Sequence, residues 1–389
     1  MSARETELTA ARTEWAAIAG IIATVSVFAI SQGLSYPLLS FILLREGVPP
    51  ALIGLSAAMT PLGFIVSAPL VPWMSRRFGA AGLTVGCAVL AAATLLLIGY
   101  TQDVWLWFPL RFLLGFFANP LYILSETWMI AITPPARRGR IMGVYTSIVS
   151  AGFATGPVTL TIVGTVGWPP FAVGIGAFLT CAVILLAVLP RMPQMQDEAH
   201  TTSVAGFVRL APLLVFAVFS AAAFEQALLA LFSVYGQAYG SSEYRISSLL
   251  AVFIAGNIAL QVPLGALAER IGASRVTLLC AVTASLGCAL LPLLFNSPLI
   301  WPVVFVWGSV AFGIYTMALI QLGERFSGSM LITGNAAFAL LWGIGGIAGP
   351  PATGAVMSAV GVQGLPLTLG LICLALAAAQ FRKCDLRSR

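Results

Sequence analysis

Long apolar segments, separated by short runs of charged and turn residues, divide the sequence into twelve parts. A helix that crosses a lipid bilayer needs roughly 20 mostly apolar residues, and the segments meet this length. Backbone N–H and C=O groups inside lipid must bond to each other, so we expect each segment to be an α-helix. The expected helices are 15–44, 51–74, 80–101, 104–131, 141–165, 169–190, 209–236, 246–268, 274–295, 299–321, 331–359 and 364–381.

The composition agrees with this pattern. Of the 389 residues, 59% are apolar and 8% are charged, whereas soluble domains carry about 25% charged residues. The alternating polar and apolar strands of a membrane β-barrel do not occur in the sequence. We therefore predict an all-α membrane protein of twelve transmembrane helices, with the lipid bilayer as its surroundings.

The basic residues predict the orientation in the membrane. Sixteen of the nineteen Arg and Lys residues fall on the side shared by both termini, and the opposite side has Arg45 and Arg245. Because cytoplasmic loops are rich in Arg and Lys, we expect both termini in the cytoplasm of a bacterial-type inner membrane. The net charge of +6 is then a property of the cytoplasmic face, and we expect no nucleic-acid partner.

Cysteine and histidine suggest no metal or cofactor. Five of the six cysteines lie in apolar segments without metal-ligand spacing, and the single histidine, His200, lies in a polar segment. We interpret the cysteines as small packing residues. A phosphate-binding loop of the Walker type is also missing from the sequence, which argues against transport driven by the chain's own ATP hydrolysis.

The polar segment 191–209 is the one long break between apolar segments. We interpret it as a cytoplasmic linker that joins an N-terminal six-helix bundle, 1–190, to a C-terminal six-helix bundle, 210–389.

The two predicted bundles are similar at a constant offset of 193 residues. Parallel repeats of this kind form one known transporter architecture, with the substrate site near the bilayer midplane between them. Glycine and proline at equivalent positions suit either a pivot or a close interface between the halves. The matched positions are Gly152, Gly156 and Pro157 with Gly345, Gly349 and Pro350; Arg76, Arg77 and Gly79 with Glu269, Arg270 and Gly272; Gln32 with Glu225; and Tyr122 with Tyr315.

Three motifs resemble those of the major facilitator superfamily, and the resemblance covers essentially the full chain. Arg111 and Gly115 have the spacing of its fourth-helix motif, Gly265 to Gly272 has the form Gly-x-Leu-x-acid-Arg-x-Gly of its loop motif, and Gly143 to Pro157 resembles the fifth-helix motif of its antiporters. The resemblance implies the major facilitator fold of two parallel-repeat six-helix bundles. Three further stretches are similar to the YcaD-like bacterial branch: Ser125-Glu126, Arg138-Gly139-Arg140 and 261–265.

Two positions depart from the family pattern. Arg76 stands where the loop motif of the first half has an acid that helps to latch the cytoplasmic side, so the resemblance does not carry that latch to this half. Leu160 and Thr161 stand where the fifth-helix motif ends in two glycines, which weakens the inference of antiport.

Polar residues in the fourth apolar segment fall on one side of the expected helix. At about 100° per residue, five positions lie within a stripe about 80° wide, which we expect to face a central cavity. The positions are Arg111, Gly115, Asn119, Tyr122 and Glu126. Arg111 and Glu126 are about 22 Å apart along the axis and cannot pair. The alternative is that each anchors helix packing at its own end.

Glu225 lies near the middle of the seventh apolar segment. A charge at the bilayer centre costs about 2.5–3.5 kcal/mol, so such a residue usually faces a cavity or a partner. A carboxyl group that gains and loses a proton as its surroundings change can couple transport to a proton gradient. The alternative is a hydrogen-bonded glutamate that holds two helices together. Gln32, Gln226, Tyr122 and Tyr315 are further candidate contacts for a substrate.

Together these features favour a proton-coupled secondary transporter of a small organic solute that works by alternating access as a monomer. Export is favoured over import because of the partial antiporter motif, while an uptake symporter or a facilitator on the same fold stays open. A membrane enzyme would need a clustered nucleophile, acid–base pair or metal site, and a sensor would be expected to carry a soluble signalling domain. Neither feature is present in the sequence.

Overall fold

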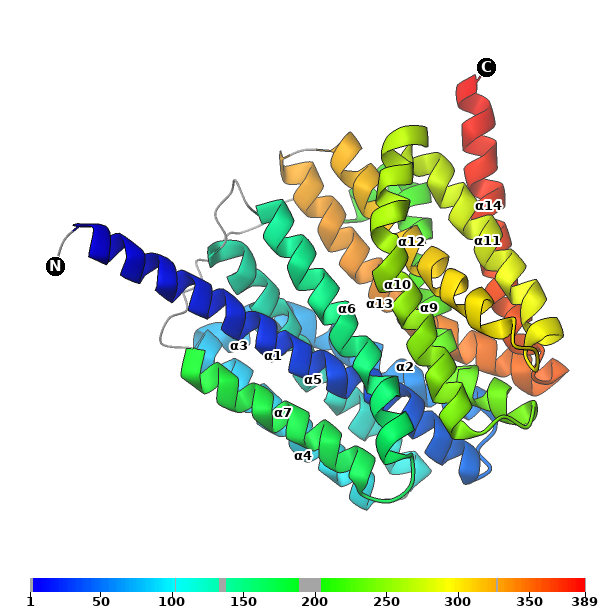
Figure 1. Ribbon diagram of the computed structural model, residues 1–389, viewed down its shortest axis with the longest axis horizontal. Helices are drawn as coiled ribbons and strands as arrows, with labels where there is room; N and C mark the ends of the chain where they lie inside the picture. Colours follow the sequence, from blue (N-terminus) through cyan, green and yellow to red (C-terminus); the bar gives the residue numbers. More distant parts are fainter. Residues whose placement is uncertain (1–2, 102, 133–137, 189–203, 327, 389) are drawn as a thin grey trace. The chain divides into compact units, whose positions relative to one another are not determined.

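The computed structural model is built of helices joined by short loops (Figure 1), and it describes residues 3–101, 103–132, 138–188, 204–326 and 328–388. The helices are α1 (Ala3–Arg45), α2 (Pro50–Ser67), the 3-10 helix η1 (Ala68–Leu70), α3 (Val71–Phe78), α4 (Ala80–Tyr100), α5 (Val104–Ile132), α6 (Arg138–Val163), α7 (Pro169–Val188), α8 (Val204–Leu210), α9 (Pro212–Ala238), α10 (Glu243–Ile271), α11 (Ala273–Leu294), α12 (Ile300–Arg325), α13 (Gly328–Val360) and α14 (Gly364–Ser388).

The helices match the apolar pattern of the sequence. Within the described residues, 11 helical segments are long and apolar enough to cross a membrane, and Ser147–Val163 in α6 is a shorter apolar stretch. These stretches correspond in order to the twelve predicted segments. The prediction of an all-α membrane protein is confirmed.

Two predicted helices differ from the structure, and the predicted linker contains part of a short helix. The first helix begins at Ala3 instead of residue 15, because the preceding residues include Ala, Glu and Arg, which favour a helix outside lipid as well. The second predicted helix is broken, since the 3-10 turn Ala68–Leu70 separates α2 from α3 and Pro69 and Pro72 lack the N–H that a continuous helix uses. The predicted linker 191–209 overlaps α8 from Val204 onwards, while its residues 191–203 lie outside the described part of the chain.

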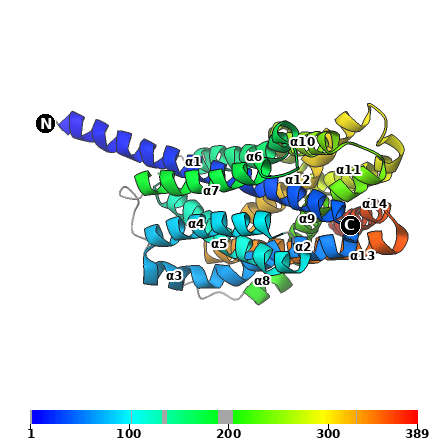
Figure 2. The same cartoon turned by 90° about the horizontal axis from the view of Figure 1, so that it is seen from below.

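The chain forms two compact units. Unit 1 contains residues 1–35, 63–159 and 166–199, and in it α4 packs against α5 and α7. Unit 2 contains residues 36–62, 160–165 and 200–389, and in it α9 packs against α13 and α12, α10 against α12, and α11 against α14 (Figures 1 and 2). The predicted division at residues 190 and 210 stays a prediction.

Two equivalent loops turn on glycine. Gly79 joins α3 to α4 with a φ of 73°, and Gly272 joins α10 to α11 with a φ of 89°. A residue with a side chain is strained in this region of φ, so glycine is needed for both tight connections. The two glycines are 193 positions apart, in agreement with the offset of the sequence repeat.

Candidate functional site

The polar stripe of α5 is anchored by a buried amide. Asn119 donates from Nδ2 to the carbonyl oxygen of Phe64 at 2.9 Å and to Oγ of Ser67 at 2.8 Å. Both acceptors lie where α2 ends before the 3-10 turn, and such an end leaves carbonyl groups that need donors. The hydrogen bonds of Asn119 therefore stabilise the backbone at the break in the second predicted helix. A contact between this residue and a substrate stays a prediction.

Arg111 lies on the same helix, and its side chain is 1% exposed. The guanidinium group keeps its charge in proteins and is expensive to place in a low-dielectric interior without polar partners. The position of Arg111 therefore fits either a charge that acts in transport or a charge that holds helices together.

We expect lysine at position 111 to retain more transport activity than alanine or glutamine, because lysine keeps the positive charge. The measurement is solute flux in liposomes that contain equal amounts of inserted protein. Normal flux by all three variants would show that the charge of Arg111 has no part in transport.

Two residues near the other end of the stripe are less buried than Arg111 and Asn119. Tyr122 is 40% exposed, while Glu126 is half-buried. Glu126 lies within electrostatic range of Tyr145 on α6, whose buried hydroxyl has no hydrogen-bond partner among the described residues. Sequence reasoning missed Tyr145, for which the signal is the one tyrosine in the apolar segment 141–165.

Glu225 lies in the most deeply buried part of α9. Every other residue from Ala221 to Gly236 is buried, whereas the side chain of Glu225 keeps accessible surface. A carboxyl group with accessible surface in a buried stretch of helix makes Glu225 a candidate for proton exchange. The main feature of the candidate site in unit 2 is this carboxyl group, which keeps accessible surface within a buried stretch of α9.

The remaining candidates are amides and a phenol. Gln226 is 2% exposed, and Gln32 on α1 in unit 1 is 3% exposed. The Gln226 Oε1 and Gln32 Nε2 atoms have no hydrogen-bond partner among the described residues. Tyr315 is half-buried and its ring lies 6.5 Å from the ring of Phe338. Both glutamines thus have buried polar atoms free for a further bond.

The repeated glycines pack helices together inside each unit. In unit 1, a Cβ atom added to Gly152 on α6 would lie 2.7 Å from the carbonyl oxygen of Ser26 and 3.0 Å from Cβ of Ala29 on α1. In unit 2, a Cβ atom added to Gly345 on α13 would lie 2.5 Å from the carbonyl oxygen of Phe219 and 2.9 Å from Cβ of Ala222 on α9.

The contacting residues are also 193 positions apart, so the sequence repeat is a repeat of contacts. Gly156 also approaches backbone, that of Gly33, and Gly349 approaches that of Ala223, although these two partners are 190 and not 193 positions apart. Each of these four glycines contacts its own unit, and the predicted role as a pivot or as a close interface between the halves stays a prediction. A side chain on any of them would separate the two helix backbones.

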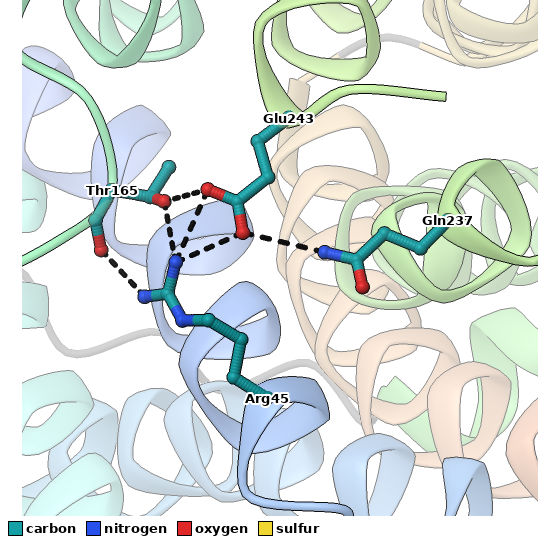
Figure 3. A network of polar contacts seen from close by, with 4 residues as sticks. All are labelled: Arg45, Thr165, Gln237 and Glu243. Carbon is teal, nitrogen blue, oxygen red and sulfur yellow. Dashed lines mark hydrogen bonds and ion pairs between the residues drawn. The ribbon is translucent and has the colours of Figure 1, made fainter. Parts of the chain in front are cut away.

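Unit 2 also contains a polar network that sequence analysis missed (Figure 3). Arg45 Nη1 lies 2.9 Å from Oε1 of Glu243 and donates to Oγ1 of Thr165 at 2.8 Å, while Arg45 Nη2 donates to the carbonyl oxygen of Thr165 at 2.6 Å. The Thr165 hydroxyl donates to Glu243 Oε2, and Gln237 Nε2 donates to Oε1 of the same carboxylate at 3.3 Å. The sequence contains one indication of this network: Arg45 is one of two basic residues assigned to the non-cytoplasmic side.

The sequence was compared with a family model and with other proteins. The model of the Major Facilitator Superfamily matches residues 21–320 and, separately, 214–384. The uncharacterized MFS-type transporter YfkF of Bacillus subtilis (strain 168) is 27% identical over 367 residues, which are 92% of this chain and 93% of that protein. The uncharacterized MFS-type transporter YcaD of Escherichia fergusonii is 24% identical over 325 residues, 81% of this chain and 82% of that protein.

Solved structures show the same fold. The nucleoside transporter NupG aligns with a TM-score of 0.79 at 13% identity, over 94% of this chain and 98% of that one. A bacterial homologue of the human lysosomal transporter Spinster, in an inward-facing and unoccupied conformation, aligns with a TM-score of 0.71 at 13% identity, over 94% of each chain.

The helices, the repeated contacts and these alignments define a multi-pass membrane transporter. The chain belongs to the major facilitator superfamily. It is a secondary transporter of a small molecule, and the relation to YcaD-like proteins expected from the sequence is confirmed at the level of distant homology. Members of this family are transporters, so the prediction that the chain is not an enzyme holds.

Proposed function

We propose that the protein couples the movement of a small organic solute to protons, with Glu225 as the residue that carries the proton. The observation behind the proposal is the accessible surface of Glu225 within an otherwise buried stretch of α9. Coupling requires a group whose interaction with a proton differs between the two states of the transporter. In this proposal the proton is exchanged at the accessible surface of this carboxyl group.

The substrate contacts in this proposal come from both predicted bundles. Arg111, Gln32 and Gln226 supply charged or polar groups in positions that are at most 3% exposed. Tyr122, Glu126 and Tyr315 have more accessible surface. Buried polar groups in an apolar surrounding are typical of sites that orient a small ligand. Asn119 has the weaker claim, because its amide already binds α2.

We further propose that the protein acts as a monomer in a bacterial inner membrane, with both termini in the cytoplasm. The distribution of basic residues supports this orientation. Export is favoured because Gly152, Gly156 and Pro157 match part of the antiporter motif and the two glycines have a defined packing role. An uptake symporter or a facilitator is the alternative on the same fold.

A flux experiment tests the coupling. Purified protein in liposomes is given a labelled nucleoside, chosen because of the likeness to a nucleoside transporter, together with an organic anion and an amphipathic cation in separate assays. We expect one class of solute to accumulate above its outside concentration when a pH gradient is imposed, and a pH-sensitive dye inside the liposomes to report proton movement. Transport that only equalises concentrations under every gradient would identify a facilitator.

A further inference from the structure

Residues from three distant stretches of the sequence meet in the Arg45–Glu243 network, in which Gln237 and Glu243 are six residues apart. Arg45 is the last residue of α1, and Thr165 lies in the loop that precedes α7. Gln237 lies in the last turn of α9, and Glu243 is the first residue of α10. By the sequence repeat, Arg45 and Thr165 belong to the first half, while Gln237 and Glu243 belong to the second.

The carboxylate of Glu243 is the centre of the network. It accepts hydrogen bonds from Arg45, Thr165 and Gln237, which come from three other segments. Its place in the first turn of α10 adds a favourable interaction with the positive end of the helix dipole. Removal of this one carboxylate would therefore leave the donors of three segments without their shared acceptor.

The adjoining helices are in backbone contact. The amide of Ala51 on α2 donates to Oγ of Ser358 on α13 at 3.1 Å. A Cβ atom on Gly54 would overlap the carbonyl oxygen of Pro350, and one on Gly354 would overlap the carbonyl oxygen of Pro50. Glycine thus lets α2 and α13 lie directly against each other in unit 2, the unit that also contains the network.

We propose that the Arg45–Glu243 network is a latch that holds this end of the protein closed and breaks when this end opens. A transporter that opens alternately to the two sides must separate its halves at one end and then at the other. The network ties segments of both sequence halves, and the α2–α13 contact joins the same two halves.

The exposure of the ion pair suits a reversible latch. The side chains of Arg45 and Glu243 are 33% and 27% exposed, so water replaces the lost bonds when they part. An exposed pair changes an equilibrium by only about fivefold or less. Such an interaction favours the closed state without preventing its opening.

The test measures how often this end opens, and it needs no substrate. Thr353 on α13 is 0% exposed and lies seven residues after Gly346, on the side of α13 that faces Pro61 of α2. A Thr353→Cys reporter, with Cys384→Ser, is treated with a maleimide that does not cross the membrane. The five cysteines whose side chains the structure describes are buried, which keeps background labelling low.

We expect Glu243→Gln and Arg45→Gln to raise the labelling rate of the reporter about fivefold, and the exchange Arg45→Glu with Glu243→Arg to bring it back towards the original rate. Glu46→Gln is the matched control, because Glu46 is exposed at the same end and has no side-chain contact in the network. Its labelling rate is expected to stay unchanged.

Equal labelling rates in the parent protein and in Glu243→Gln would overturn the latch. An equal rise in Glu46→Gln and Glu243→Gln would overturn it too, since the effect would then come from surface charge. Because the readout is opening and not solute flux, these results stay separate from any failure of the proton-coupling proposal.

Discussion

Replacement of Glu225 by glutamine is expected to abolish solute accumulation driven by a pH gradient while solute exchange continues. Glutamine has the size of a protonated glutamate and keeps its ability to hydrogen-bond, so the packing of α9 should survive. Glutamine cannot titrate, and a group with one protonation state cannot link the proton gradient to a change between conformations. Gradient-driven accumulation and exchange are measured in the same liposome preparation.

Two controls sharpen this experiment. Glu225→Asp keeps a titratable group and should retain part of the accumulation. Glu324→Gln makes the same chemical change at an exposed residue near the end of α12 and should leave accumulation normal. Full gradient-driven accumulation by Glu225→Gln would remove Glu225 as the coupling residue and direct attention to Glu126.

Replacement of Gly349 by leucine is expected to prevent the protein from folding in the membrane. A Cβ atom at this position would overlap the carbonyl oxygen of Ala223, which is backbone and cannot move aside as a flexible side chain does. Overpacking of a core costs about 1–3 kcal/mol and more where the backbone must shift. Since folded proteins are stable by only about 5–15 kcal/mol, the loss is large.

The yield of monodisperse protein and its thermal unfolding in detergent measure the effect. Gly86→Leu is the matched control, because Gly86 also lies inside a membrane helix, α4, and a Cβ atom there meets nothing within 4 Å. Leucine favours a helix over glycine by somewhat less than 1 kcal/mol, so the control should be at least as stable as the parent protein. Equal yields of Gly349→Leu and Gly86→Leu would contradict the packing role of Gly349.

Much of the fold follows from the sequence because a bilayer leaves few choices to the backbone. Apolar stretches of about 20 residues must be helices in lipid, which is why the ends of α4, α5 and α7 are within two residues of the prediction. Outside lipid this constraint is absent, and there the prediction missed the early start of α1 and the short helix α8. The break after Ser67 was missed because the apolar content of a segment does not show where an α-helix changes into a 3-10 turn.

The candidate site was less accessible to sequence reasoning. Glu225 and Arg111 stand out in the sequence because charged residues are rare in membrane helices. The rarity identifies them as candidates, but it does not show which residues they contact. The bonds from Asn119 to α2 join residues more than 50 positions apart, and Arg45 and Glu243 are 198 positions apart. No periodicity in the chain predicts pairs at such distances, which depend on how the helices pack.

The repeated glycine contacts have a consequence for how this chain can diverge. Ser26 and Phe219 occupy equivalent contacts, yet their side chains are unrelated, because the atom approached by the glycine is the carbonyl oxygen in both cases. The contact therefore tolerates changes of side chain on α1 and α9 as long as the glycines remain. Gln32 and Glu225, on those same two helices, already differ between the halves. Side chains along α1 and α9 can thus change while the scaffold is inherited intact, so chains with different residues on these helices can evolve from one architecture.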